Sequence, residues 1–287
     1  MRRRWNWPRF CQAIAFTVIG ASAVATLAVL AFIVLYVLRL GLPHVTWEFL
    51  TGHPEEMGRE GGILPTIVGT VALSLGAILI AAPLGIGTAI FLTEYTWESP
   101  LTRAVRFGAE ALAGVPSIIY GLFGFIFFVT YLRMGWSILS GSLTLAIMVL
   151  PTIIRTAEEA ILTVPRTYRD LSFGLGATRW QMVTTVVLPS ALPGIVTGII
   201  LAIGRTVGET AAVIFTAGTA LTMPTSLLAP ARTMSVHFFI LAVEGISLEK
   251  AYATGAVLIL TTLLTNVLAN WLIVRAVKRH TQRGAMA

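Results

Sequence analysis

Long apolar stretches constrain this chain more than any other feature, and the first covers residues 10–38 without a charged side chain. About 18 consecutive apolar residues suffice for a helix to cross a bilayer. Charged residues make up 11% of the sequence, whereas soluble proteins carry about 25%. The alternation of apolar and polar residues that marks the strands of a membrane barrel is missing. The sequence therefore predicts an all-α polytopic membrane protein.

Six spanning helices are predicted from the apolar pattern. They cover residues 11–38, 63–92, 107–132, 138–162, 188–218 and 251–274. The first is longer than the roughly 7–15 apolar residues of a signal-peptide core, so we interpret it as a retained helix. Pro83 and nearby glycines predict a kink or tilt in the second. We expect one transmembrane domain over residues 11–274, with basic tails at 1–10 and 275–287.

The distribution of basic residues predicts the orientation of the helices. With the N-terminus inside, thirteen of the 20 Lys and Arg residues lie on the cytoplasmic side and five outside. The cytoplasmic residues are Arg2, Arg3, Arg4, Arg9, Arg103, Arg106, Arg166, Arg169, Arg179, Arg275, Lys278, Arg279 and Arg283. The external residues are Arg39, Arg59, Arg133, Arg232 and Lys250. Both termini are then cytoplasmic, and the net charge of +7 reflects membrane anchors rather than a surface for nucleic acid.

Three charged residues fall inside predicted spans: Arg155 in the fourth, and Arg205 and Glu209 in the fifth. A charge at the bilayer centre costs about 2.5 to more than 10 kcal/mol, so each needs a partner or a hydrated cavity. On a continuous helix Arg205 and Glu209 share one face, because they are four residues apart. They form either a structural ion pair or a polar pathway. In a pathway, Arg205 meets an anion that Glu209 orients or balances, with Thr210 beside them.

Arg155 leaves the same two options open. Glu158 and Glu159 lie one turn further on and offer ion pairs, or Arg155 adds positive charge to the pathway. Two guanidinium groups at one cavity favour a phosphate-like substrate, because their forked donors match tetrahedral oxyanions. In the third span, Pro116 frees a backbone carbonyl and Ser117 adds a hydroxyl. These residues suit a proline-kinked packing helix and a pathway-lining helix equally well.

The loop between the fourth and fifth spans, residues 163–187, predicts a short amphipathic helix. A break follows at Gly176, then the basic and aromatic pair Arg179 and Trp180, and finally Leu188-Pro189 where the fifth span begins. Such a helix lies either on the lipid surface or in a cleft of another protein. The arrangement favours docking into a partner protein.

This loop resembles the EAA loop of ABC-importer permeases, in which an acidic and two small residues precede a glycine and, further on, Leu-Pro. The first three positions are taken here by Asp170, Leu171 and Ser172, all of which depart from the family pattern. The later positions match at Gly176, Ala177, Leu188 and Pro189. The resemblance implies that residues 167–180 form the coupling helix that contacts the ATPase subunits, with Gly176 at its turn.

Longer motifs narrow the resemblance. They include "GGILPTIVGT", "PLGIGTAIFLTEY", "LAGVPSIIYGLFGF" and "GRTVGETAAVIFTAG". Together they resemble the PstA family of permease subunits of phosphate ABC importers, which is related to the PstC family. The resemblance implies a type I ABC importer permease fold in the bacterial or archaeal plasma (inner) membrane. It places Arg155, Arg205 and Glu209 in the substrate pathway.

The resemblance also implies partners. These are a PstC-like second permease subunit, two PstB-like ATPase subunits and an external PstS-like phosphate-binding protein. No cofactor is expected in this chain, since ATP and Mg would be bound by the ATPase subunits. The only lysines, Lys250 and Lys278, lie outside any Gly-x4-Gly-Lys-Ser/Thr pattern. We therefore expect no nucleotide site of that type and no enzymatic activity in the chain itself.

Other functions are compatible with parts of the sequence. An importer of phosphonate, sulfate or molybdate would use the same arginines, which do not distinguish one oxyanion from another. An ion-coupled secondary carrier or anion channel would use Glu209 as a proton carrier, but it gives the 163–187 loop no purpose. A membrane enzyme acting on a phosphorylated lipid is disfavoured, because no catalytic constellation of His, Asp, Glu or Ser stands out.

Overall fold

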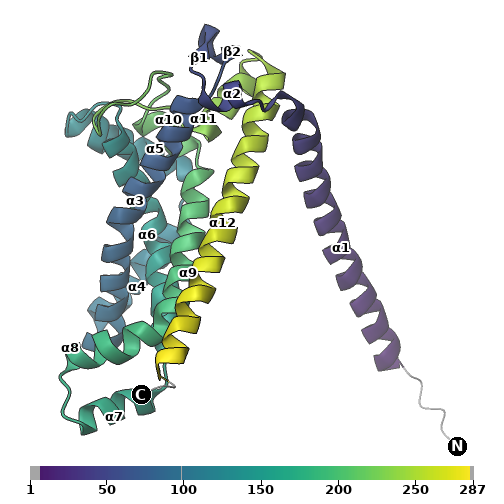
Figure 1. The fold of residues 1–287 in the computed structure, drawn as a ribbon. Coiled ribbons are helices and arrows are strands. Elements are labelled where there is room, and N and C mark those ends of the chain that lie inside the picture. The colour runs from purple at the N-terminus through teal and green to yellow at the C-terminus, as the bar shows by residue number, and fades with distance from the viewer. Residues whose placement is uncertain (1–6, 98, 285–287) are drawn as a thin grey trace, which may run out of the picture.

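A bundle of long helices forms most of the protein, and α1 (Trp7–Gly41) leans away from it (Figure 1). The computed structural model describes residues 7–97 and 99–284, so most of the predicted N-terminal tail lies outside the described residues. Within them, five helices are long and apolar enough to cross a membrane, and a bent helix pair makes a sixth candidate. The chain is therefore an all-α, multi-pass membrane protein, as predicted.

The remaining elements follow in chain order. The helices are α2 (Trp47–Thr51), α3 (Leu64–Ile90), α4 (Pro100–Ala113), α5 (Ser117–Gly124), α6 (Ile138–Leu162), α7 (Arg166–Gly174), α8 (Arg179–Met182), α9 (Leu188–Val207), α10 (Ala211–Thr216), α11 (Met234–Val243) and α12 (Leu248–Gly284). The π-helical stretches η3 (Phe91–Tyr95), η4 (Phe125–Tyr131) and η5 (Val183–Val187) continue α3, α5 and α8. The 3-10 turns are η1 (Leu42–His44) and η2 (Glu56–Gly58). A short antiparallel hairpin pairs β1 (Pro54–Glu55) with β2 (Glu60–Gly61), Pro54 opposite Gly61.

The two ends of the bundle carry different elements. α7 and α8 lie at one end, near the end of α12, and α1 begins at the same level but away from the bundle (Figure 1). We call this the inner end, because the basic residues predict that it faces the cytoplasm. The hairpin, α2, α10 and α11 lie toward the opposite, outer end (Figure 1).

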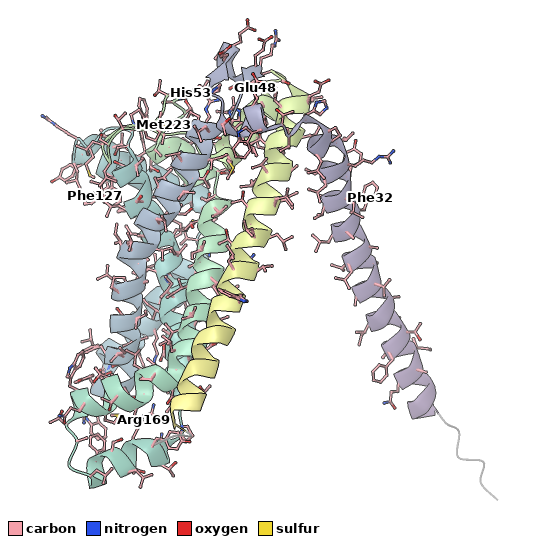
Figure 2. All side chains as sticks on the ribbon, viewed as in Figure 1. Phe32, Glu48, His53, Phe127, Arg169 and Met223 are labelled. Atoms are coloured by element: carbon pink, nitrogen blue, oxygen red, sulfur yellow. The ribbon has the colours of Figure 1, made fainter. Side chains whose placement is uncertain are left out.

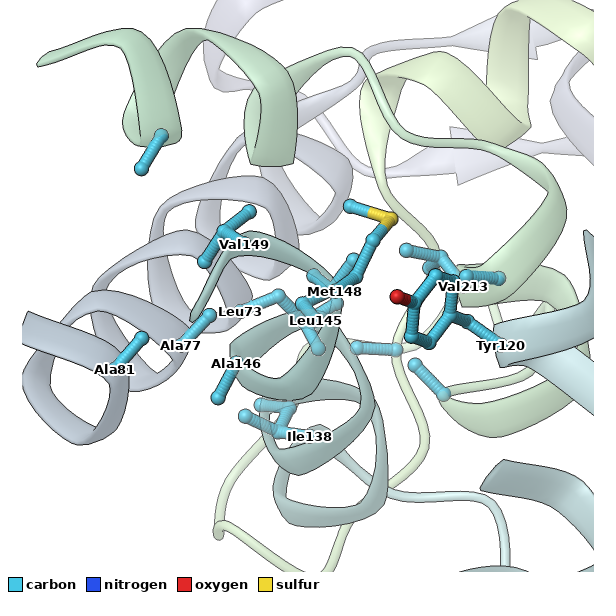
Figure 3. Packing of buried hydrophobic residues seen from close by; sticks show 14 of the residues in the cluster. Leu73, Ala77, Ala81, Tyr120, Ile138, Leu145, Ala146, Met148, Val149 and Val213 are labelled. Carbon is cyan, nitrogen blue, oxygen red and sulfur yellow. The ribbon is translucent and has the colours of Figure 1, made fainter. Parts of the chain in front are cut away.

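The core of the bundle is built on α3 and α6, with α5, α9 and α10 packed around them. Leu73 of α3 and Leu145 of α6 belong to one cluster of fully buried side chains (Figure 3). α6 and α9 approach so closely at Gly198 that a side chain there would collide with Thr156. Small residues permit such close contacts between membrane helices, whose association depends on van der Waals packing rather than on exclusion of water.

Four of the predicted spans correspond to continuous helices. α6 has the predicted bounds, residues 138–162. α1 and α12 extend past both predicted ends of the first and sixth spans. Pro83 lies inside α3, which continues as η3 to Tyr95.

The third span is not the single helix over 107–132 that the sequence predicts. It begins earlier, at Pro100, where the Ser99 hydroxyl accepts a hydrogen bond from the Thr102 amide and caps α4. Between α4 and α5 the axis turns by 103°. Pro116 explains this break, because it lacks an amide hydrogen and disfavours helical geometry in the residue before it.

The fifth span, predicted as one helix over 188–218, is also broken. α9 ends at Val207, and residues 208–210 separate it from α10. Gly208 lowers helical stability at this point. Glu209 then favours a new start, because its carboxylate accepts a hydrogen bond from the Ala212 amide. The predicted span was carried across the polar residues Arg205, Glu209 and Thr210, so the break was missed.

α1 contacts the bundle chiefly near its outer end. Tyr36 meets the edge of the Tyr252 ring on α12 at a centroid distance of 6.1 Å, and a side chain at Gly41 would collide with Tyr252 and Ala256. Further toward the inner end its side chains are exposed, Phe32 among them at 67% (Figure 2). α1 is thus an apolar helix with a free surface along most of its length.

Candidate functional site

Arg155 lies on α6 beside a pocket of about 170 Å³ between α6 and α4. The charged residues that line it are Arg106, Glu110, Arg155, Glu158 and Glu159. Arg155 Nη2 lies 3.9 Å from Glu110 Oε1, and the two side chains are 51% and 61% exposed. This distance is beyond hydrogen-bond range, so the pair is loose. The Arg155 guanidinium is accessible to a ligand.

Glu158, one of the two partners that the sequence offered for Arg155, pairs with Arg106 instead. Arg106 Nη2 and Glu158 Oε1 are 2.7 Å apart, and the Glu158 side chain is 13% exposed. This tight pair ties α4 to α6 at the edge of the pocket. Arg155 is left with Glu110, a residue of α4 whose proximity the sequence spacing did not indicate.

Arg205 lies in the last turn of α9 and is exposed. Its guanidinium is close enough to Tyr120 of α5 for an electrostatic interaction. Tyr120 is buried, and its hydroxyl donates a 2.7 Å hydrogen bond to the Leu112 carbonyl on α4. Arg205 therefore lies near the break in the third span, where the half-buried Ser117 begins α5.

The expectation that Arg205 and Glu209 share a helix face is wrong, because α9 ends between them. Among the described residues, no ion pair joins the two at 4 Å or less. Glu209 instead binds to neighbouring backbone and to α11. Its Oε1 accepts a hydrogen bond from the Ala212 amide at 3.2 Å, and its carbonyl accepts one from Ser235 Oγ at 2.7 Å. Thr210 follows it, half-buried, at the start of α10.

The 163–187 loop folds as two short helices rather than one helix over 167–180. α7 ends at Gly174, and Gly176 takes a positive φ of 82°, which glycine adopts without strain. The Ala177 amide donates a hydrogen bond back to the Ser172 carbonyl and closes the turn. Thr178 then caps α8 by exchanging hydrogen bonds with Gln181. The turn at Gly176 is confirmed, whereas Arg179 and Trp180 belong to the second helix.

One face of α7 is exposed at the inner end. Asp170 is exposed, Leu171 and Leu175 are 65% and 89% exposed, and Trp180 of α8 is 63% exposed. A shallow hollow lined by Thr167, Asp170, Leu171, Gly174 and Leu175 lies between these side chains. Leu188 and Pro189 begin α9, and Leu188 packs on the buried cluster around Ala157 and Met182. The exposed apolar side chains are typical of a docking surface.

The opposite face of α7 carries an ion pair that sequence reasoning missed. Arg169 Nη2 lies 2.7 Å from Glu94 Oε1 of η3, and the two side chains are only 15% and 6% exposed. Arg169 lies at the inner end of the bundle (Figure 2). The only sequence signal was a glutamate at the end of an apolar stretch, in "FLTEY", and nothing in it identified a partner 75 residues away.

At the outer end, His237 of α11 and Arg232 are buried side by side. Arg232, predicted to be an external basic residue, is 7% exposed; its Nε donates a hydrogen bond to the Thr219 carbonyl at 2.8 Å. Its Nη1 lies 3.4 Å from His237 Nδ1. Burial, with Arg232 adding a smaller effect, lowers the pKa of His237 to about 4. His237 is therefore neutral at physiological pH and packs under Gly58 of η2.

Comparison with known proteins relates this chain to membrane components of transport systems. Residues 81–281 match the model of the family described as "Binding-protein-dependent transport system inner membrane component". The chain is 34% identical over 280 residues to the probable ABC transporter permease protein YqgI of Bacillus subtilis, with 92% of this chain and 95% of YqgI aligned.

Two relatives carry more specific names. The phosphate transport system permease protein PstC of Mesorhizobium japonicum is 34% identical over 80% of this chain and 79% of its own length. The phosphate transport system permease protein PstA of Yersinia pestis is 32% identical over 97% of this chain and 95% of its own length.

Solved structures with the same fold include permease chains of two transporters. A chain of the MetNI methionine ABC transporter, in an inward-facing conformation, aligns with a TM-score of 0.63 at 17% identity, over 75% of this chain and 95% of its own. A chain of a bacterial alginate ABC transporter, solved with a pentasaccharide-bound periplasmic protein, aligns with a TM-score of 0.62 at 16% identity, over 96% of each chain. At these identities the likeness establishes the fold alone.

Proposed function

Since the chain belongs to the family of binding-protein-dependent transport system inner membrane components, we propose that it is the permease subunit of an ATP-driven importer of inorganic phosphate. Its role as an ABC importer permease follows from the family and the type I permease fold. The substrate is the proposed part. The observation that carries it is the alignment of almost the whole chain with a phosphate transport permease, at 32% identity.

Two features of the structure support an anionic substrate. Arg155 and Arg205 both have exposed guanidinium groups, and among the described residues neither is held by a tight ion pair. Arginine offers planar, forked donors to phosphate oxygens. We propose that phosphate passes near these two residues, with Ser117, Glu209 and Thr210 beside Arg205 at the broken spans.

We propose the following partners. A second permease subunit completes the pathway in the plasma membrane, and an external binding protein delivers phosphate. Two ATPase subunits bind at the inner, cytoplasmic end. The exposed face of α7, around Asp170, Leu171 and Leu175, with Trp180 of α8, is the proposed ATPase contact. ATP and Mg are bound by the ATPase subunits and not by this chain. The alignment with a transporter solved with its periplasmic protein supports an assembly of this kind.

The test is transport by the complete importer. The chain is co-expressed with the second permease subunit and the ATPase subunits, reconstituted in vesicles and supplied with the phosphate-loaded binding protein. We expect ATP-dependent accumulation of labelled inorganic phosphate. An excess of unlabelled sulfate, molybdate or phosphonate should leave it unchanged.

Two results would contradict the proposal in different ways. ATP-dependent uptake of one of the other oxyanions, with no uptake of phosphate, would assign the importer to that substrate. Uptake by the purified chain alone, driven by an ion gradient without ATPase subunits, would make it a secondary carrier.

A further inference from the structure

Arg169 joins α7 to two transmembrane helices at once. Its Nε and Nη2 donate hydrogen bonds to Glu94 Oε1 at 3.0 and 2.7 Å, at the inner end of the α3–η3 helix. Its Nη1 donates to the Val164 carbonyl at 2.6 Å, and Nη2 also donates to the Ile161 carbonyl at 3.0 Å, both at the end of α6. The guanidinium thus neutralises a shielded carboxylate and caps α6.

Arg179 attaches α8 to the same point. Its Nη1 donates a 3.1 Å hydrogen bond to the Glu94 carbonyl, and its guanidinium carbon lies 5.7 Å from the centre of the Tyr95 ring. α8 continues through η5 into α9. The inner ends of α3, α6 and α9 are therefore linked around Glu94.

The two faces of α7 have different surroundings. Arg169 points into the bundle and is largely buried, whereas its chain neighbours Asp170 and Leu171 are exposed. The chain connects α7 to α6 and, through the turn at Gly176, to α8, but not to α3. The contact with Glu94 gives α7 a direct side-chain link to α3.

We propose that Arg169 and Glu94 form a rigid joint that transmits a displacement of α7 to α3 and α6 together. The inference rests on the proposed function, in which an ATPase subunit binds α7. A charge buried in this way is favourable only while its partners stay in place, so α7 and the bundle move as one body rather than bending at the turn. Arg169 is a positioning residue, since it acts on the transmembrane helices and does not touch substrate.

The direct test measures the distance between α7 and α3 during the ATPase cycle of the complete importer. Cys11 is the only cysteine in the chain, so its replacement by serine permits spin labels at Phe173→Cys on α7, which is exposed but outside the hollow, and Leu84→Cys on α3, in a complex whose other subunits lack reactive cysteines. We expect the same narrow distance distribution in the nucleotide-free and ATP-trapped states. With Glu94→Gln added, the distribution should shift or broaden on ATP trapping. An unchanged distribution in this variant would overturn the joint.

A second test measures coupling. In assembled importers carrying Glu94→Gln or Arg169→Lys, the inorganic phosphate moved per ATP hydrolysed should fall about fivefold or more, which is typical of a lost coupling interaction. The matched control is Arg166→Gln, because Arg166 lies exposed on the same helix and forms no ion pair within the described part of the chain; it should keep the wild-type ratio. Glu94→Arg combined with Arg169→Glu restores opposite charges but removes the bonds to the α6 carbonyls. It should therefore recover part of the ratio.

Assembly is checked by co-purification of the ATPase subunits, and ratios are compared only among assembled complexes. If Glu94→Gln and Arg169→Lys assemble and keep the wild-type ratio, the inference is wrong. A wild-type importer that hydrolyses ATP without moving phosphate would refute the proposed substrate, while the distance measurement would still decide on the joint.

Discussion

Arg169 and Arg155 both face a glutamate on another helix, yet the two contacts are built in opposite ways. Arg169 lies 2.7 Å from Glu94, and both side chains are mostly buried. Arg155 lies 3.9 Å from Glu110, and both are more than half exposed. The first contact suits a fixed attachment, because a buried pair is costly to separate. The second suits exchange with a ligand, because an exposed pair contributes little.

The largest predicted effect concerns stability and tests the comparison directly. Arg169→Ala should destabilise the assembled permease by about 3–5 kcal/mol, because it leaves the Glu94 carboxylate buried without its partner. Arg155→Ala should cost less than about 1 kcal/mol. Thermal unfolding of the purified complexes measures both values. Equal losses of stability would show that the two contacts do not differ in the way described.

The next prediction concerns transport through the loosely held charges. Arg205→Gln should reduce phosphate uptake by about ten- to a hundredfold, the range expected when hydrogen bonds to a charged group are lost. The melting temperature should be nearly unchanged, because Arg205 is exposed and forms no tight ion pair among the described residues. Normal uptake by this variant would remove Arg205 from the pathway. Phosphate uptake by Arg205→Lys, which keeps the charge but lacks the forked guanidinium donors, should lie between that of wild type and that of Arg205→Gln.

A third buried group, His237 at the outer end, extends the comparison to pH. Its pKa is lowered to about 4, so the unfolded chain takes up this proton first as the pH falls below about 6.5. The stability that the neutral imidazole contributes is complete above that pH and is lost toward pH 4. Between pH 7.5 and pH 5 this loss should amount to about 2 kcal/mol.

The measurement for His237 is the melting temperature of the complex at both pH values, in wild type and in His237→Asn. The asparagine keeps a side-chain acceptor for Arg232 but does not titrate. The difference in melting temperature between the two pH values should therefore be smaller than in wild type. A pH dependence identical to wild type would show that other groups cause it.

The smallest predicted effect concerns Glu110. Glu110→Gln removes the carboxylate nearest to Arg155 and should lower the phosphate concentration for half-maximal uptake about two- to fivefold, in line with the strength of an exposed ion pair. Glu158→Gln is the informative contrast, since it disrupts the tight pair with Arg106 and should reduce stability instead. A weaker apparent affinity in Glu110→Gln would mean that Glu110 helps to bind the substrate rather than competing with it.

Sequence reasoning succeeded where one physical property dominates. The bounds of α6 follow from an apolar stretch with polar ends, and the turn at Gly176 follows from the conformational freedom of glycine. Both depend on local chemistry. The all-α membrane class was likewise predicted from hydropathy, whereas the permease family was recognised from the resemblance of longer motifs.

It failed where the outcome depends on contacts between distant residues or on the path of the backbone. Hydropathy does not register a break in an apolar segment, so the sequence offered only a proline kink at Pro116, where the axis turns by 103°, and missed the break at Gly208. The partner of Arg169 lies 75 residues away, and Arg155 faces Glu110 rather than Glu158 because α4 packs against α6. Spacing along one helix gives no access to such pairings.

The broken third span has a consequence for the biogenesis of this protein. α5 with its continuation η4 covers only Ser117–Tyr131, whereas an independent membrane helix needs about 20 residues. We therefore expect the insertion machinery to accept α4 and this helix as one segment, with neighbouring helices and water satisfying the backbone groups that the break at Pro116 frees. The helix from Arg179 to Val207, by contrast, is long enough to insert without α10.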